Sequence, residues 1–153
     1  MGVKGGRFAP IPKEELRPGE ATVRSTHGNE RTVLVVDDHA ELRVSLQHLL
    51  ERAGYRVELA ANGVEGLERL RGGRIHLVVL DIDMPVMNGR AFLAARAEDD
   101  VLARVPVVVY SADPQPAALP AGVSAWIWKG TESADLLAAL ERCSAGDRTL
   151  RAR

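Results

Sequence analysis

The sequence has little of several features that would point to particular functions. Cys143 is its single cysteine, so an intrachain disulfide is excluded and a reducing cytosol fits. No apolar run is long enough to span a membrane, and the basic N-terminus lacks the apolar segment of a secretory signal. No G-x-G-x-x-G motif follows the first predicted strand, which argues against dinucleotide binding. We therefore predict a cytoplasmic protein without membrane insertion.

Neither sign of charge dominates. The chain has 153 residues, with 20 Lys and Arg against 21 Asp and Glu. Such a balance gives no strong attraction to nucleic acid, so no direct nucleic-acid partner is expected. The length suits one folded domain with its own core, and the sequence shows no internal repeat.

The two ends of the chain differ in composition from its middle. Residues 1–30 are rich in glycine, proline and charge and have no sustained period, which predicts a flexible N-terminal arm. A solvated arm is the simpler interpretation, although its basic residues could touch an acidic partner. Residues 31–145 are predicted to form the folded domain, and residues 146–153 a basic C-terminal tail.

Between the ends, short apolar strands alternate with amphipathic helices, which predicts a parallel sheet covered by helices on both faces. The segment after the fourth strand holds Pro114, Pro116 and Pro120, so we expect its helix to be short, irregular or missing. The predicted strands are 32–36, 55–60, 75–80, 105–110 and 125–128, and the predicted helices are 42–53, 63–71, 89–104 and 133–143.

One stretch, residues 77–89, organises the rest. Four apolar residues end at Asp81, a pattern typical of a buried parallel strand whose C-terminal end opens onto a site. Ligands of open α/β sheets bind at that end of the strands. Pro85 and Asn88-Gly89 then turn the chain. We therefore expect the carboxylate of Asp81 at a strand tip, in a crevice.

Other polar residues follow the other strands. Asp37 and Asp38 come after the first strand, Ser111 ends the fourth, and Lys129 follows the fifth. Parallel strands bring these residues to one edge of the sheet. Each has a simpler explanation alone: a helix cap for the acidic pair, a turn for Ser111, a solvated strand end for Lys129. Together with Asp81, they favour a shared site.

Three carboxylates in one place repel, and a divalent cation is the usual remedy. Mg²⁺ prefers carboxylates, waters and a phosphate oxygen, so we predict Asp38 and Asp81 as ligands, Asp37 through a bound water, and the backbone carbonyl of Asp83. Lys129 suits a phosphoryl oxygen, as a compact positive charge. The combination predicts a carboxylate nucleophile that accepts a phosphoryl group.

With these residues assembled, the chain resembles the receiver domain of bacterial two-component response regulators over about residues 31–143. Asp37-Asp38 resembles the acidic pair of the family, and residues 81–89 resemble its D-x-x-M-P-x-M-[DN]-G segment. Ser111-Ala112 is similar to its hydroxyl switch and following small residue. Residues 122–129 are similar to the strand that carries its switch aromatic, here Trp126, and its essential lysine.

The resemblance implies a flavodoxin-like (βα)5 fold with strand order 2-1-3-4-5, here with a shortened or irregular fourth helix. It implies that Asp81 takes a phosphoryl group from a histidine kinase or phosphotransfer protein, with Mg²⁺ bound. Ser111 and Trp126 would then move together in a population shift. Such a domain is no conventional enzyme, but it catalyses its own phosphorylation and dephosphorylation.

Three departures from the family stand out. The family usually has proline after the lysine, whereas this chain has Gly130, which could supply the turn through its freedom in φ and ψ. The fourth crossover is about one helical turn shorter than usual, which predicts an altered output surface. No output domain follows Cys143, so we expect a stand-alone regulator that acts by contact with a downstream protein.

Four further residues carry hypotheses. Asp83 and Asp113 each lie two positions after a site residue and should alter phosphate lifetime, in a direction that the sequence does not give. Trp128, next to the lysine, is expected to be partly exposed and is a candidate contact for a protein partner. His39 is interpreted as a surface residue at a helix start.

Two alternatives remain open. The chain could be a receiver-like adaptor that works without phosphorylation, which Gly130 and the short fourth crossover favour. Asp81-Ile82-Asp83 also fits the D-x-D nucleophile motif of haloacid-dehalogenase-type phosphatases. That motif normally follows the first strand of a longer chain, which disfavours this hypothesis.

Overall fold

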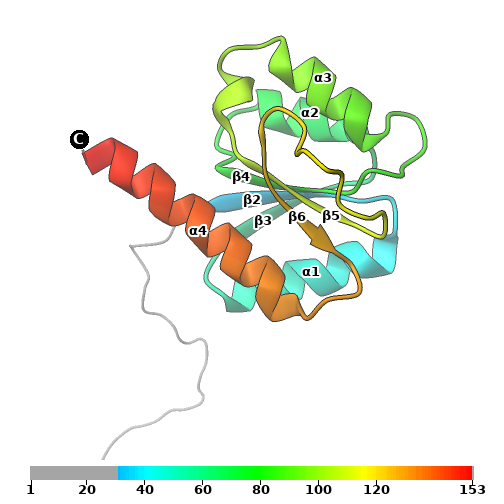
Figure 1. Ribbon diagram of the computed structural model, residues 1–153, viewed down its shortest axis with the longest axis horizontal. Helices are drawn as coiled ribbons and strands as arrows, with labels where there is room; N and C mark the ends of the chain where they lie inside the picture. Colours follow the sequence, from blue (N-terminus) through cyan, green and yellow to red (C-terminus); the bar gives the residue numbers. More distant parts are fainter. Residues whose placement is uncertain (1–30, 153) are drawn as a thin grey trace, which may run out of the picture. The chain divides into compact units, whose positions relative to one another are not determined.

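The computed structural model describes residues 31–152, with side chains for residues 31–145; the predicted N-terminal arm lies outside these residues. The described residues form a five-stranded, fully parallel sheet in the order β3-β2-β4-β5-β6, which confirms the predicted order 2-1-3-4-5 (Figure 1). The strands are β2 (Thr32–Val36), β3 (Arg56–Ala60), β4 (Leu77–Leu80), β5 (Val107–Ser111) and β6 (Val123–Trp128).

Helices cover both faces of this sheet. In Figure 1, α2 and α3 lie on one side of the strands and α1 and α4 on the other. The helices are α1 (Ala40–Arg52), α2 (Gly63–Arg71), α3 (Gly89–Ala97) and α4 (Ser133–Ala152), with the 3-10 turn η3 (Leu102–Arg104) after α3. Within the described chain, no helix combines the length and the apolar character needed to cross a membrane.

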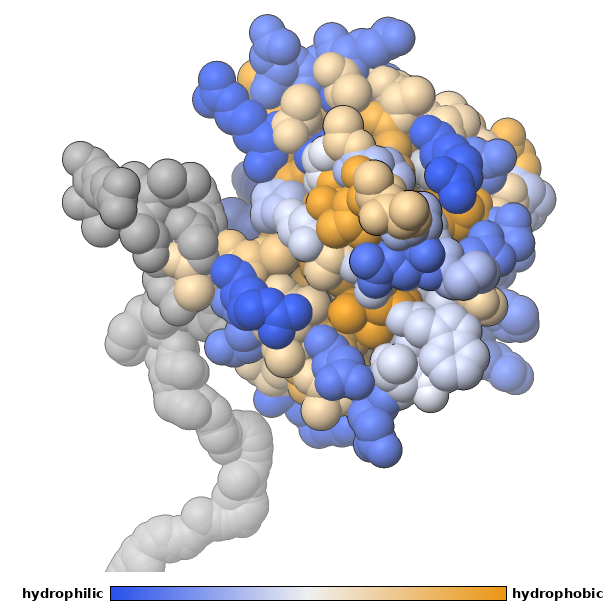
Figure 2. Space-filling model, viewed as in Figure 1, coloured by the Kyte–Doolittle hydropathy of each residue, from blue (hydrophilic) through white to orange (hydrophobic). Residues whose placement is uncertain are grey.

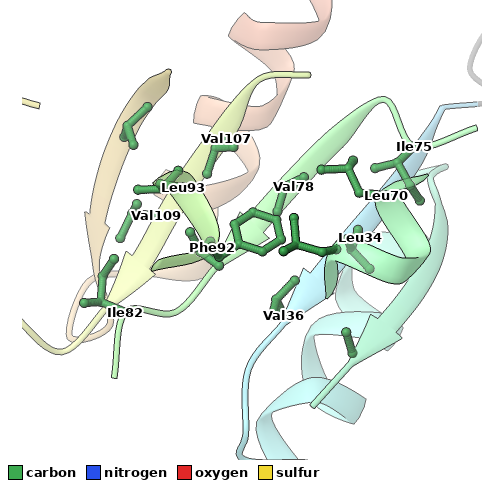
Figure 3. Close-up of a cluster of buried hydrophobic side chains, with 14 of the residues drawn as sticks. Leu34, Val36, Leu70, Ile75, Val78, Ile82, Phe92, Leu93, Val107 and Val109 are labelled. Carbon is green, nitrogen blue, oxygen red and sulfur yellow. The ribbon is translucent and has the colours of Figure 1, made fainter. Parts of the chain in front are cut away.

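The central strands are mostly apolar because both of their faces are buried. Alternate residues of β2 point to opposite faces and so enter two different cores. Leu34 and Val36 join Val78 and Phe92 under α2 and α3 (Figure 3). The second core lies under α1 and α4 and contains Val33, Val35, Leu46, Leu50, Leu136 and Leu140. Packing in the two cores keeps the strands in register, because a slip by one residue would turn core side chains to the wrong face.

The pairing of β2 with β4 places the first and third strand tips beside each other. Val36 is paired with Leu80, and the Asp81 N–H donates to the Val36 carbonyl at 2.9 Å. The Asp37 N–H donates to the Ala60 carbonyl on the other side, at 3.1 Å. Asp37 and Asp81 therefore leave the sheet next to each other, on backbone that is hydrogen-bonded to neighbouring strands.

Two helices end at positions that differ from the predicted ones. α3 ends at Ala97 rather than near Arg104, because the Asp99 carboxylate accepts the N–H groups of Val101 and Leu102 and starts a new turn there. α4 continues to Ala152 instead of ending near Cys143, so residues 146–152, predicted as a tail, prolong the helix. No proline follows Cys143 to stop it.

The connection between β5 and β6, residues 112–122, contains no helix. The expected fourth helix is thus missing rather than short, which agrees with the three prolines in this segment. Seen from the side of Figure 2, apolar residues gather over this connection, with hydrophilic residues around them. Leu119, which belongs to this connection, is 37% exposed.

A buried arginine of α3 packs against this connection. Arg96 of α3 is only 2% exposed and donates through Nη2 to the carbonyls of Ala103 and Val105, at 2.8 and 2.5 Å. A side chain at Gly122, whose φ is +84°, would collide with the guanidinium. No carboxylate of the described residues forms an ion pair with Arg96, and burial lowers its pKa. The guanidinium thus joins α3 to both connections around β5.

Candidate functional site

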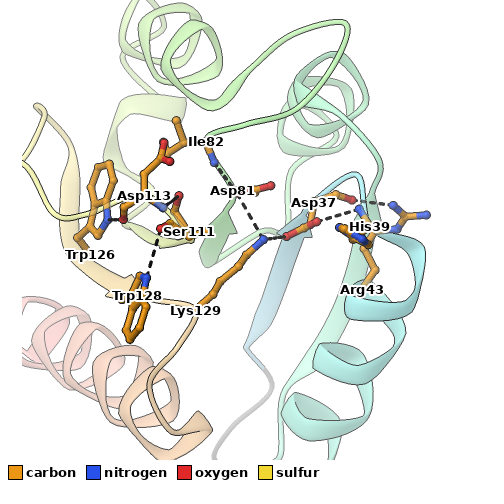
Figure 4. Close-up of polar contacts among 11 residues, drawn as sticks. Asp37, His39, Arg43, Asp81, Ile82, Ser111, Asp113, Trp126, Trp128 and Lys129 are labelled. Carbon is orange, nitrogen blue, oxygen red and sulfur yellow. Dashed lines mark hydrogen bonds and ion pairs between the residues drawn. The ribbon is translucent and has the colours of Figure 1, made fainter.

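The tips of four strands meet in one cleft of about 600 Å³ (Figure 4). Asp81 follows β4, Ser111 ends β5, and Lys129 follows β6, while Asp37 follows β2. The N-terminal part of α1 closes the other side of the cleft, through Asp38, His39, Glu41, Leu42 and Ser45. The polar residues that follow separate strands in the sequence therefore lie together in space.

Lys129 stands between the two buried carboxylates. Its Nζ atom lies 2.9 Å from Asp37 Oδ2 and 3.5 Å from Asp81 Oδ1. Burial alone would lower the pKa of Lys129, but the hydrogen bond and charge of Asp37, followed by the charge of Asp81, raise it overall. The ammonium is therefore fully protonated at neutral pH and partly neutralises both carboxylates.

Asp81 is the least compensated of these groups. It is 5% exposed, and its Oδ1 accepts the Ile82 N–H at 2.8 Å. Burial first, and then the charge of Asp37, raise the pKa of the Asp81 carboxyl to about 6, against the opposing effect of Lys129. A buried carboxylate with this much unfavourable electrostatics, open to a cleft, is suited to receiving a positively charged or electrophilic group.

Asp37 is held rigidly by its surroundings. Its Oδ1 accepts the His39 N–H at 2.8 Å, and its backbone carbonyl accepts Arg43 Nη1 at 2.6 Å. His39, not the acidic pair, is the N-cap residue of α1, and it caps without its side chain. Neither Asp37 nor Asp38 is thus the N-cap residue, although the Asp37 carboxylate accepts the N–H of the residue that is.

Two carboxylates that suit a hard cation lie on this side of the cleft, with the imidazole of His39 beside them. Donor atoms of Asp37, Asp38 and His39 lie within 4.8 Å of one another, and Asp81 lies across Lys129 from them (Figure 4). Carboxylates close to a buried Asp81, whose charge Lys129 offsets only in part, fit a divalent ion such as Mg²⁺. His39 is exposed and is the N-cap residue of α1, as expected for a surface residue at a helix start close to the site.

Ser111 is buried at 1% exposure, in a turn of its own. Its Oγ accepts the Asp113 N–H at 3.0 Å, which is the turn role considered from the sequence. Ser111 also lines the cleft, together with the exposed Asp83 and the half-buried Asp113. Both roles therefore apply to the same hydroxyl.

Two tryptophans of β6 bind the segment after Ser111. Trp126 is buried and donates its indole N–H to the Asp113 carbonyl at 3.0 Å. Trp128 is 53% exposed, as predicted, and donates to the Ala112 carbonyl at 3.2 Å. Sequence analysis missed these bonds, because nothing in the local pattern links the indoles to backbone 13 and 16 residues away.

Gly130 does not act as predicted. Its φ is outside the left-handed region, so its conformational freedom is not what the turn requires. A Cβ atom at this position would instead overlap the six-membered ring of the Trp128 indole. Glycine therefore leaves room for the indole in this position.

Comparison with known proteins identifies the family. The pattern described as "Response regulator receiver domain" matches residues 33–141. The chain is 39% identical over 111 residues to the transcriptional regulatory protein PrrA of Mycobacterium tuberculosis, covering 69% of this chain and 46% of that protein. It is 33% identical over 123 residues to the nitrate/nitrite response regulator protein NarL of Escherichia coli, covering 78% and 57%.

Solved structures agree. The chemotaxis protein CheY4 of Vibrio cholerae is 30% identical and superimposes with a TM-score of 0.67 over 74% of this chain and 98% of that one. A CheY-like receiver domain protein from Methanospirillum hungatei is 26% identical with a TM-score of 0.69, over 78% and 98%.

The match with the curated relatives is partial on their side. This chain spans 46% of the length of PrrA and 57% of the length of NarL, and the relatives it matches include multidomain regulators. The expectation of a stand-alone regulator therefore stays a prediction. What the strand order, the strand-tip residues and the family pattern establish together is that this chain belongs to the response regulator receiver domain family.

Proposed function

We propose that Asp81 accepts a phosphoryl group from a histidine kinase or a histidine phosphotransfer protein, and that this modification switches a protein-contact surface. The observation that carries the proposal is the buried Asp81 carboxylate, which opens onto the cleft with Lys129 Nζ 3.5 Å away. In the reaction, a carboxylate oxygen of Asp81 attacks phosphorus, the phosphorus–nitrogen bond of the donor breaks, and the imidazole leaves with its bonding electrons.

The other residues of the cleft hold and neutralise the transferred group. The Lys129 ammonium would share its hydrogen bonds between Asp37 and a phosphoryl oxygen, and the Ser111 hydroxyl would donate a hydrogen bond to another phosphoryl oxygen. Asp37, Asp38, Asp81 and the backbone carbonyl of Asp83 would hold Mg²⁺, which supplies positive charge for the phosphoryl oxygens. The chain thus mainly positions groups, while the donor supplies the reactive bond.

The switch would begin at Ser111. Its Oγ accepts the Asp113 N–H, so a Ser111 that moves towards a phosphoryl group would pull on or break this bond, and that segment is tied to Trp126 through the Asp113 carbonyl. Movement of Ser111 would therefore reach Trp126 directly. The exposed Trp128 beside it is the proposed contact for a downstream protein partner.

The test uses the purified full chain with Mg²⁺ and acetyl phosphate or beryllofluoride, followed by intact mass and tryptophan emission. We expect a Mg²⁺-dependent gain of one phosphoryl group that Asp81→Asn abolishes and Asp83→Asn, an exposed carboxylate of the same cleft, retains. Decay of the adduct should change in Asp83→Asn or Asp113→Ala if these residues set phosphate lifetime; equal decay in both would refute that role.

The missing fourth helix favours a second candidate, a receiver-like adaptor that works unmodified. A folded chain that takes up no phosphoryl group and does not respond to beryllofluoride would favour it. A partner that binds wild type and Asp81→Asn equally well would then support the adaptor directly.

A further inference from the structure

The side chain of Trp128 spans two segments that flank the reactive residues. At one end its indole N–H donates to the carbonyl of Ala112, the residue after Ser111. At the other end its six-membered ring fills the space beside Gly130, the residue after Lys129. One half-exposed indole therefore touches the chain directly downstream of both the hydroxyl and the ammonium of the site.

The backbone between these contacts is closely bonded. The Lys129 N–H donates to the Ser111 carbonyl at 2.9 Å, which prolongs the β5–β6 ladder by one residue. The Trp128 carbonyl then accepts both the N–H and the hydroxyl of Thr131, at 3.0 and 2.8 Å. Lys129 thus sits in a turn whose start is held by β5 and whose end is held by Thr131 and the indole.

With the Trp128 ring in this position, only glycine fits at residue 130, and a side chain there would require the ring to move. Any L-amino acid, proline included, carries a Cβ atom, and a Cβ atom here would overlap the Trp128 ring. The φ of Gly130 is one that other residues adopt, so space is the remaining reason for glycine. Trp128 and Gly130 are matched to each other, and a change at either one removes the contact.

We infer that Trp128 and Gly130 form a clamp that positions Lys129 and Ser111 for the phosphoryl group. The clamp takes over support that a helix between β5 and β6 would give, since residues 112–122 contain none. Trp128 is a positioning residue: it acts through the backbone at Ala112 and Gly130 and touches neither Asp81 nor the transferred group. Its role in the reaction rests on the proposed phosphorylation of Asp81.

A double-mutant cycle tests the clamp, with Gly130→Ala, Trp128→Leu and the combined variant of the full chain. Phosphorylation of Asp81 by acetyl phosphate with Mg²⁺ is followed by intact mass. We expect Gly130→Ala to slow phosphorylation about fivefold when Trp128 is present and less than about twofold in the Trp128→Leu chain, because contacting residues are coupled. Gly130→Pro, which introduces the usual family residue, should also slow the reaction, and Trp128→Leu should relieve that effect.

A second readout does not depend on phosphorylation. In a Trp126→Phe background Trp128 is the single tryptophan, and Gly130→Ala should lower its fluorescence anisotropy and shift its emission to the red. Equal effects of Gly130→Ala in both Trp128 backgrounds, or an unchanged Trp128 signal, would overturn the clamp. Absence of any adduct in the wild type would overturn the proposed function and the positioning role with it, while the fluorescence would still decide whether indole and glycine are matched.

Discussion

The connection from β4 to β5 and the connection from β5 to β6 leave the sheet at the same edge, but they are built differently. The first contains α3, which begins at Gly89 with the Asn88 side chain as its cap. The second, residues 112–122, has no helix and is held by side chains of distant elements: the indoles of Trp126 and Trp128, and Arg96 beneath Gly122. A few long-range side-chain contacts can therefore stand in for the regular bonding of a helix.

The largest expected effect is on the free energy of unfolding and concerns Asp81, which follows β4 at the start of the first connection. Asp81 has a pKa of about 6 in the folded chain, against 3.8 for a free carboxyl, so the folded state binds more protons than the unfolded state between these values. Stability therefore falls as pH rises through this window, and the cost persists above it. Without Mg²⁺ at about pH 8, we expect Asp81→Asn to raise the free energy of unfolding by about 3 kcal/mol.

Urea unfolding across pH measures this gain, which should disappear below about pH 4. Asp83→Asn is the matched control, because Asp83 is exposed in the same cleft and should change stability little. A gain that does not depend on pH would contradict the assignment of this cost to the Asp81 charge.

The second effect tests the support beneath the helix-free connection. Arg96→Met removes the donors to the Ala103 and Val105 carbonyls and the group against which Gly122 rests. We expect the free energy of unfolding to fall by about 2 kcal/mol, even though the buried charge is also removed. The exposed Arg104→Met serves as control in the same urea titration, and an equal loss in both variants would show that burial of Arg96 is not the reason.

The smallest expected effect is the loss of one hydrogen bond from each of the two connections. Trp126→Phe removes the indole donor to the Asp113 carbonyl, and Asn88→Ala removes the cap that accepts the Ala91 N–H. Each should cost about 1 kcal/mol, because each breaks one hydrogen bond to the backbone. Thermal unfolding of both variants measures the costs side by side. A neutral Trp126→Phe would mean that apolar packing alone holds the helix-free connection.

The sequence predicted what depends on local pattern. Apolar runs that end in Asp81 or Lys129 mark strand tips whatever packs around them, and parallel pairing then brings these tips together. The end of α3 was missed because the Asp99 side chain competes for backbone N–H groups, a choice that helical periodicity does not reveal. The role of Gly130 was missed because it depends on where the Trp128 ring lies, and alternation along a strand can indicate a shared face but not the position of a ring.

The short connection between β5 and β6 also bears on how the site reassembles after opening. Among the described residues, β6 is an edge strand that pairs with β5 alone, so a single ladder of hydrogen bonds holds it in the sheet. The entropy of closing a loop grows slowly with its length, and residues 112–128, which link Ser111 to Lys129, contain no helix. This link keeps the strand end that carries Lys129 at a high effective concentration near the strand end that carries Ser111, so the two parts of the candidate site meet again readily after β6 separates from β5.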